Sequence, residues 1–262
     1  MSLNSILFDI GRTKTRVAFS DNIESFEEPT VFETDHNYEE GIRKLVEVIE
    51  GCAKGREITN IAGGITRALE DWQINRLQND LGNKFGSNIK IENDSAIVGL
   101  GEAVFGAGKE YQIVAYITVS TGVGGARIVE GKIDERAIGF EPGKQIIDME
   151  NGQMKTLEEL VSGSALEQKT GKHPKEITDP RVWEEHAKIL AIGINNIIVN
   201  WSPNCIVLGG SMITGNPAIP LDQTERYLKD ILTGYPEIPI IKKAELGDFG
   251  GLWGALAILR QR

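Results

Sequence analysis

The chain is poor in the residues that build disulfide frameworks and zinc sites. Its 262 residues include only two cysteines, Cys52 and Cys205, and three histidines, His36, His173 and His186. Cysteines so far apart form no disulfide framework, and no zinc-binding spacing is present. We therefore expect no bound zinc and a reducing, cytoplasmic setting.

The sequence also lacks the marks of membrane, secreted and nucleic-acid-binding proteins. No apolar run approaches the ~20 residues that span a bilayer, and no basic segment followed by an apolar stretch suggests a signal peptide. Basic residues number 28 against 38 acidic ones, a net charge of −10, whereas proteins that grip phosphate backbones usually carry a basic surface. We expect neither a membrane nor a nucleic acid as partner.

Glycine, in contrast, is abundant. It makes up 30 of the 262 residues, about 11%, whereas its usual share in proteins is roughly 7%. Much of it follows predicted strands, at Gly11, Gly122 with Gly124 and Gly125, Gly209-Gly210, and Gly247 with Gly250-Gly251. Loops beyond the carboxyl ends of strands expose backbone N–H groups, and glycine lets a phosphate approach them closely. Four such turns predict a nucleotide-binding protein.

Strand-like and helix-like segments alternate along the chain, which predicts an α/β protein. The expected strands are 6–10, 13–20, 29–34, 58–62, 88–92, 113–120, 126–133, 205–208 and 238–246, and the expected helices are 38–52, 72–85, 96–104, 157–169, 184–201 and 252–259. A strand, glycine turn and second strand occur near the start and again from Ile113, which indicates a duplication. We predict an N-terminal lobe at 1–110, completed by 247–262, and a larger lobe at 111–246.

The sequence does not fit the common single-loop nucleotide motifs. No G-x-x-x-x-G-K-[ST] run is present, which argues against a P-loop. The run Gly122–Gly125 lacks the third glycine of a dinucleotide fingerprint and leads into a strand instead of a helix. The phosphates are therefore expected to be held between two lobes.

Several motifs, in order, resemble the ROK family (repressors, open reading frames, kinases). The matching segments are Phe8-Asp9-Ile10-Gly11-Arg12-Thr13-Lys14 (family D-x-G-G-T), Glu92-Asn93-Asp94, Val119–Gly125 (VSTGVGG, family G-T-G-V-G-G), Glu141-Pro142-Gly143-Lys144 (family E-x-G-H), Leu157-Glu158 running into Ser162-Gly163, and Ile206–Gly210. The resemblance covers nearly the whole chain. It implies a two-lobed, duplicated actin-like ATPase (ribonuclease H-like) fold with a cleft, and an ATP- and Mg²⁺-dependent sugar kinase.

The resemblance also assigns roles to single residues. Asp94, placed where a strand meets a helix, would be the general base, and Asp9 would hold Mg²⁺ directly or through water. The ATP phosphates would be bound by Gly11, Arg12, Thr13, Lys14, Thr121, Gly122, Gly124, Gly209 and Gly210. The sugar would be bound by Asn93, Glu141, Lys144 and Glu158. A homodimer is a further implication of the family.

Each role has a plainer alternative. Asp94 could be a helix N-cap, Asp9 a turn former, and the two glutamates solvated surface charges. Besides a smaller change at Ser120, where the family's second loop often has glycine, two positions depart from the family pattern. Arg12 replaces a glycine, which would crowd the turn but add positive charge near the phosphates. Lys144 replaces the histidine of E-x-G-H, so it can donate but not accept a hydrogen bond.

These departures leave other functions open. A catalytically weak sugar or nucleotide sensor of the same fold is the main alternative, and an actin-like ATPase that acts on no sugar is another. Family repressors carry a helix-turn-helix before the first strand, whereas this sequence starts at its first predicted strand. DNA binding is therefore not expected. The sugar and the hydroxyl phosphorylated stay open at this stage.

Overall fold

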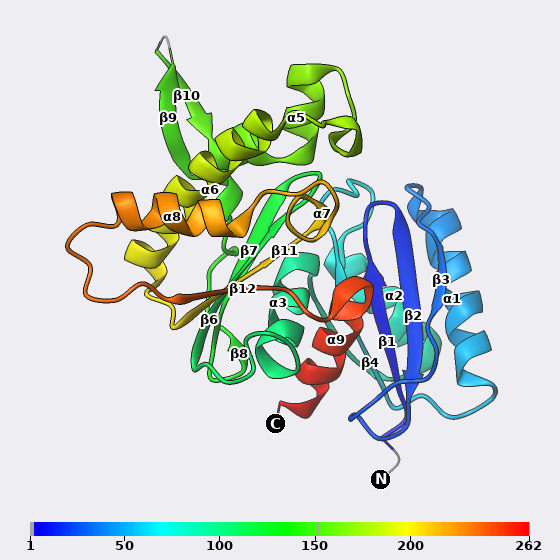
Figure 1. Cartoon of the computed structure of the whole chain (residues 1–262). Coiled ribbons are helices and arrows are strands. Elements are labelled where there is room, and N and C mark those ends of the chain that lie inside the picture. The colour runs from blue at the N-terminus through cyan, green and yellow to red at the C-terminus, as the bar shows by residue number, and fades with distance from the viewer. Residues whose placement is uncertain (1–2, 151, 262) are drawn as a thin grey trace. The chain divides into compact units, whose positions relative to one another are not determined.

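The structure, a computed structural model, describes residues 3–150 and 152–261. The chain divides into two compact units, each built around its own sheet (Figure 1). Unit 1 comprises Met1–Gly106 and Leu246–Arg262, and unit 2 comprises Ala107–Glu245. The C-terminal segment therefore belongs to the same unit as the N-terminal one.

Unit 1 contains a five-stranded mixed sheet in the order β3-β2-β1-β4-β5. Its strands are β1 (Ser5–Ile10), β2 (Lys14–Ser20), β3 (Thr30–Glu33), β4 (Asn60–Ile65) and β5 (Asn88–Asn93). β1 pairs antiparallel with β2 and parallel with β4, and every residue of β1 is buried. A continuous apolar run suits such a central strand, which is covered on both faces.

Four helices cover the sheet of unit 1: α1 (Tyr38–Ala53), α2 (Ile74–Phe85), α3 (Asp94–Val104) and α9 (Gly250–Arg260), the last preceded by the 3₁₀ turn η3 (Gly247–Phe249). Apolar side chains of α1 and α2 join a core with alternate residues of β1, among them Ile6 and Phe8. α9 packs against α3 and contacts β1 and β4. The apolar C-terminal helix is thus part of this unit's core.

Unit 2 contains a second five-stranded mixed sheet in the order β12-β11-β6-β7-β8, and a separate two-stranded ribbon. The sheet strands are β6 (Ile113–Val119), β7 (Val123–Val129), β8 (Lys132–Ile133), β11 (Cys205–Gly209) and β12 (Ile240–Lys243), and the ribbon strands are β9 (Ile146–Glu150) and β10 (Gln153–Thr156). The long helix α6 (Pro180–Trp201) supplies much of the core from one face, while Ile192 and Val199 on its other face are exposed.

The remaining helices of unit 2 are shorter. They are α4 (Leu157–Val161), α5 (Gly163–Thr170), α7 (Ser211–Thr214) and α8 (Leu221–Ile231), with the 3₁₀ turns η1 (Pro142–Lys144) and η2 (Pro174–Glu176). A capping box starts α4, since Thr156 and Glu159 satisfy each other's backbone N–H groups.

The two sheets share one topology, which confirms the duplication suggested by the sequence. In both, an antiparallel hairpin, β1–β2 or β6–β7, is followed by parallel strands on the other side of its first strand. β4 and β5 in unit 1 thus correspond to β11 and β12 in unit 2.

Some predicted boundaries were wrong. The predicted strand 58–62 is β4 at Asn60–Ile65, so Gly63 and Gly64 lie inside the strand and not in a turn after it. Glycine is needed at these two positions because Cβ atoms there would approach Phe8 and Ile97 within 2.5 Å. Gly124 and Gly125 likewise lie inside β7, not in the turn before it.

Three further segments differ from the prediction. The expected helix 157–169 breaks into α4 and α5, because Ser162 is extended and its side chain caps α5. The strand 126–133 is divided between β7 and β8 by a turn with positive φ at Glu130 and Gly131. The strand 238–246 is only Ile240–Lys243, and the β9–β10 ribbon, α7 and α8 were not predicted.

Candidate active site

The first glycine turn joins β1 to β2 in unit 1. The N–H of Gly11 donates to the carbonyl oxygen of Lys14 over 3.0 Å, and a Cβ on Gly11 would lie 3.2 Å from that oxygen. Arg12, Thr13 and Lys14 carry exposed side chains. The turn therefore presents a hydroxyl and two cations to solvent beside backbone N–H groups.

Arg12 does not crowd this turn, contrary to expectation. Its side chain is exposed, and it is not among the described residues with a positive φ. The imidazole Nε2 of His36 lies 3.0 Å from the Arg12 carbonyl oxygen. The N–H of Thr34 donates to the carbonyl oxygen of Thr13 over 2.9 Å. The segment after β3 thus holds the turn by its carbonyl groups.

Asp9 is a buried carboxyl group near the end of β1. Burial raises its pKa to about 7, against the opposing effect of Arg16 and with a smaller contribution from the charge of Asp94. The guanidinium of Arg16 lies 3.6 Å from its Oδ2. A Cβ on Gly251 would lie 2.5 Å from its Cγ, so Asp9 packs directly on the start of α9.

Asp94 is the first helical residue of α3, where β5 ends. Its neighbour Asn93 is the N-cap: the Asn93 Oδ1 accepts from the N–H groups of Ser95 and Ala96 over 3.1 and 3.3 Å. Asp94 Oδ1 accepts from the Ser95 N–H over 2.7 Å. The helix cap is therefore provided by Asn93, which removes the main plain alternative for Asp94.

Sequence reasoning missed two neighbours of Asp9. Arg16 lies opposite Asp9 in the β1–β2 register, which the predicted hairpin and its short turn could have revealed. Gly251 approaches Asp9 from the far end of the chain, and no local pattern signals such a contact. Both belong to unit 1.

The corresponding turn of unit 2, Ser120–Gly122, joins β6 to β7. The N–H groups of Gly163 and Ser164, at the start of α5, donate to the carbonyl oxygens of Ser120 and Thr121 over 2.7 and 3.3 Å. Thr121 is exposed. With its carbonyls fixed in this way, the loop has a defined orientation, to which a hydroxyl contact between Ser120 and Ser211 adds.

The glutamate of the next predicted segment contacts this turn. Glu158 Oε2 accepts from the N–H of Val123 over 2.8 Å, and Oε1 accepts from Lys144 Nζ over 2.6 Å. Burial acts to raise the pKa of Glu158, but the hydrogen bonds from Lys144 and Val123 outweigh it and hold the pKa below its usual value. Glu141 is exposed and its charge helps to raise the pKa of Lys144, after the larger effect of Glu158.

The last predicted phosphate residues stand at the end of β11: Gly209 is its last residue and Gly210 follows it. Gly210 has φ +86°, and a Cβ there would lie 2.3 Å from the carbonyl oxygen of Val119. A Cβ on Gly209 would lie 2.7 Å from the Tyr116 hydroxyl. Both glycines are therefore required by close packing on β6. In unit 2 the structure brings Lys144 and Glu158 beside the 120–123 turn, and Gly209-Gly210 beside the end of β6.

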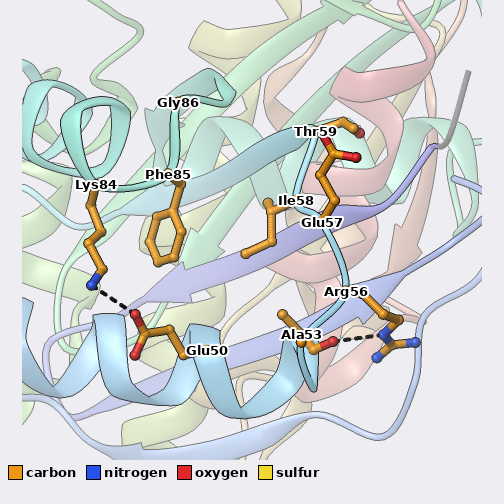
Figure 2. Close-up of a pocket in the computed structure, with 10 residues that line it drawn as sticks. Glu50, Ala53, Arg56, Glu57, Ile58, Thr59, Lys84, Phe85 and Gly86 are labelled. Atoms are coloured by element: carbon orange, nitrogen blue, oxygen red, sulfur yellow. Dashed lines mark hydrogen bonds and ion pairs between the residues drawn. The ribbon is translucent and has the colours of Figure 1, made fainter.

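A different hollow of unit 1, of about 570 Å³, lies at the opposite edge of its sheet, where Thr59 precedes β4 and Gly86 precedes β5 (Figure 2). Three of its charged side chains are engaged: Lys84 pairs with Glu50 over 2.8 Å, and Arg56 donates to the Ala53 carbonyl. The hollow lies at the amino ends of β4 and β5. Ligands of such sheets bind beyond the carboxyl ends of strands, so the candidate site is at the opposite end of the strands.

The part of the chain that the structure describes has neither a cluster of metal ligands nor a membrane-spanning helix. Residues 3–150 and 152–261 contain no group of three or more His, Cys, Asp or Glu side chains arranged to hold a metal ion. No helix in that part of the chain is long and apolar enough to cross a membrane.

Known structures define the class of fold. The ROK hexokinase of Thermus thermophilus matches with a TM-score of 0.80 at 23% identity, over 97% of each chain. A ROK family glucokinase of Streptomyces griseus, solved with glucose and AMPPNP, matches with a TM-score of 0.79 at 23% identity, over 99% of this chain and all of that one. The chain has the actin-like ATPase fold, as predicted.

Sequence comparison then gives the family. The sequence profile of the ROK family matches residues 6–262. The N-acetyl-D-glucosamine kinase of Histophilus somni is 24% identical over 303 residues, covering 97% of this chain and 98% of that protein. The chain belongs to the ROK family, which confirms the resemblance seen in its motifs.

Proposed function

We propose that this chain is an ATP-dependent sugar kinase that phosphorylates a hydroxyl of a hexose or hexose-like sugar. Family membership and relatives named as sugar kinases support the enzyme class. The observation that carries the proposal is the placement of Asp94, whose carboxylate stands at the start of α3 while Asn93 caps the helix.

In the proposed reaction, Asp94 accepts the proton of the sugar hydroxyl as its oxygen attacks the γ-phosphorus of ATP, and ADP leaves. Asp94 is half-buried and close enough to Asp9 for its charge to act on that group. The Ser95 N–H that donates to Asp94 Oδ1 orients the carboxylate. Its second oxygen is the one proposed to face the substrate.

The nucleotide phosphates are proposed to bind N–H groups, hydroxyls and cations of the glycine turns. The donors are Gly11, Arg12, Thr13 and Lys14 of unit 1, and Thr121, Gly122, Gly124, Gly209 and Gly210 of unit 2. Exposure of Arg12, Lys14 and Thr121 supports this role. Gly11 and Gly124 contribute least, because the Gly11 N–H already donates to the Lys14 carbonyl oxygen and Gly124 pairs with Thr118 inside the β6–β7 ladder.

Asp9 suits the magnesium ion of Mg-ATP, held directly or through water. It is a buried oxygen ligand whose pKa is raised by burial more than Arg16, 3.6 Å away, lowers it, so a cation beside it would stabilise the ionised carboxylate. When bound, the ion would neutralise charge on the transferring phosphoryl group.

The sugar is proposed to contact Asn93, Glu141, Lys144 and Glu158. Carboxylates accept hydrogen bonds from hydroxyls, and an ammonium or amide donates to hydroxyl or carbonyl oxygens. The Asn93 Oδ1 is used by the α3 cap, which leaves its amide Nδ2 for the substrate.

The test is sugar-dependent ADP release, coupled to NADH oxidation, with a panel of glucose, mannose, fructose, N-acetylglucosamine and N-acetylmannosamine. Asp94→Asn should lower kcat by at least about a hundredfold, the usual contribution of general-base catalysis, while the circular dichroism spectrum stays unchanged. The matched control is Asp222→Asn, which neutralises an exposed aspartate in the first turn of α8. Equal turnover of Asp94→Asn and Asp222→Asn would exclude Asp94 as the base.

A sensor with little catalysis is the second candidate, favoured by the two departures from the family pattern. Lys144 occupies one oxygen of Glu158, and Arg12 replaces a glycine of the first turn. A sensor would bind a panel sugar in calorimetry with no ADP release, whereas a kinase shows both.

A further inference from the structure

Glu158 makes contacts on two sides in unit 2. One carboxylate oxygen accepts from Lys144 of η1, and the other accepts from the backbone N–H of Val123, directly after the Ser120–Gly122 turn. A single side chain therefore joins the segment expected to bind sugar to the turn expected to bind phosphate.

The turn is fitted closely to this carboxylate. A Cβ on Gly122 would lie 2.7 Å from Glu158 Oε2, so a side chain at this position would displace the carboxylate from where it now lies. Val123 itself is buried. Gly143 lies in the segment that carries Lys144, and a Cβ added at Gly143 would lie 2.4 Å from the Val123 carbonyl oxygen. η1, α4 and the turn thus meet around one backbone position.

The hydrogen bonds are of the strong kind. Both involve an ionised acceptor, and the Lys144 bond joins two ions over 2.6 Å. The pKa of Glu158 is lowered and that of Lys144 raised by this pairing, so the link is present throughout the neutral range. Thr156 and Glu159 start α4 with a capping box, which fixes the position of Glu158 in its first turn.

We propose that Glu158 is a positioning residue for the phosphate-binding turn, with Lys144 as its counter-ion, in addition to any contact with sugar. The carboxylate holds the Val123 N–H and so orients the preceding N–H groups of Thr121 and Gly122 toward the nucleotide. A sugar that draws on Glu158 would thereby act on the same turn. This inference rests on the proposed nucleotide role of that turn.

The sign of one effect separates positioning from simple charge. A carboxylate beside phosphates repels them, so Glu158→Gln should tighten nucleotide binding if Glu158 acts by charge alone. If Glu158 positions the turn, the same substitution should weaken binding, because glutamine cannot accept from Val123 and Lys144 with both of its terminal atoms.

The test measures binding of Mg-AMPPNP by calorimetry without sugar, to the full-length wild type and variants. Glu158→Gln should weaken binding about tenfold, as expected for loss of a hydrogen bond to a charged group. Lys144→Met should weaken it less, and Lys144→Arg should restore wild-type affinity. The matched control is Glu159→Gln, which removes the neighbouring charge but keeps the capping box and should leave affinity unchanged.

Amide hydrogen exchange of Val123 provides a readout that does not depend on nucleotide. The amide should exchange faster in Glu158→Gln than in the wild type or Glu159→Gln. Unchanged or tighter AMPPNP binding by a folded Glu158→Gln protein, or unchanged protection of Val123, would overturn the inference. If the wild type binds no AMPPNP, the proposed kinase function fails as well; if it binds and Glu158→Gln binds equally, only this inference fails.

Discussion

Replacing Gly254 with alanine should force helices α3 and α9 apart. A Cβ at Gly254 would lie 1.7 Å from the carbonyl oxygen of Ile97, half of the 3.4 Å at which ordinary contact begins. The obstacle is backbone, so no change of rotamer can remove it. On the opposing helix, Gly101 is also closely packed, since its Cβ would lie 2.6 Å from the Gly250 carbonyl oxygen.

The expected cost follows from two opposing effects. Overpacking of a tight core costs about 1–3 kcal/mol and occasionally more, and a backbone clash places Gly254→Ala at the upper end. Alanine recovers about 0.5–1 kcal/mol of helix propensity. We expect a net destabilisation of about 2–3 kcal/mol.

The matched control is Gly82→Ala in α2, another helical glycine with a normal backbone conformation but no atom within 4 Å of the added Cβ. It should stabilise the protein by about 0.5–1 kcal/mol, because only the propensity effect remains. Urea unfolding followed by circular dichroism compares the two. The midpoint of Gly254→Ala should fall and that of Gly82→Ala should rise.

The same substitution should also impair the reaction. α3 begins with Asp94 and α9 begins beside Asp9, so separating the helices moves the proposed base away from the proposed magnesium ligand. kcat of Gly254→Ala should fall under conditions in which the variant is fully folded. A midpoint equal to that of Gly82→Ala would refute the close packing of these helices.

Two further predictions concern pH. Since burial raises the pKa of Asp9 to about 7, above its unfolded value, its ionisation opposes folding above pH 7; the metal-free Asp9→Asn protein should therefore unfold at higher urea than the wild type at pH 8 and lose kinase activity, and a lower midpoint would contradict the burial argument. Burial lowers the pKa of His186, whose Nδ1 contacts the Val182 carbonyl, so the unfolded chain takes up this proton first and stability should fall as the pH drops below about 6.5; the midpoint of His186→Phe should depend less on pH between 8 and 5.5, and an equal dependence would exclude His186 as the source.

Much of the fold could be predicted from local patterns. The buried run of β1, the 3.6-residue period of α1 and the repeated strand–turn–strand unit all appear as short-range signals. The amphipathic helix α8 also has such a period, with Thr224 and Leu228 on its buried face, and could have been found. The break at Ser162 was harder, because a serine that caps a following helix looks like a residue within one long helix.

The candidate site was predictable where its residues are neighbours in sequence. Asp94 and Asn93 were predicted as site residues together, but which of them caps α3 depends on backbone geometry that the letters do not encode. Contacts between distant segments, such as Gly251 with Asp9 or Glu158 with Val123, depend on tertiary packing. Lys144 was noted as a departure, and the structure adds its ion partner.

The composition of unit 1 has a consequence for synthesis of the protein. Its sheet is complete once residue 93 has been made, yet α9, which packs on β1, β4 and α3, is translated only after the whole of unit 2. Unit 2, in contrast, is one continuous stretch. The usual order, in which the N-terminal domain folds first on the ribosome, is therefore reversed: unit 2 can reach its native state while β1 and α3, which carry Asp9 and Asp94, still lack the helix α9 that packs on them.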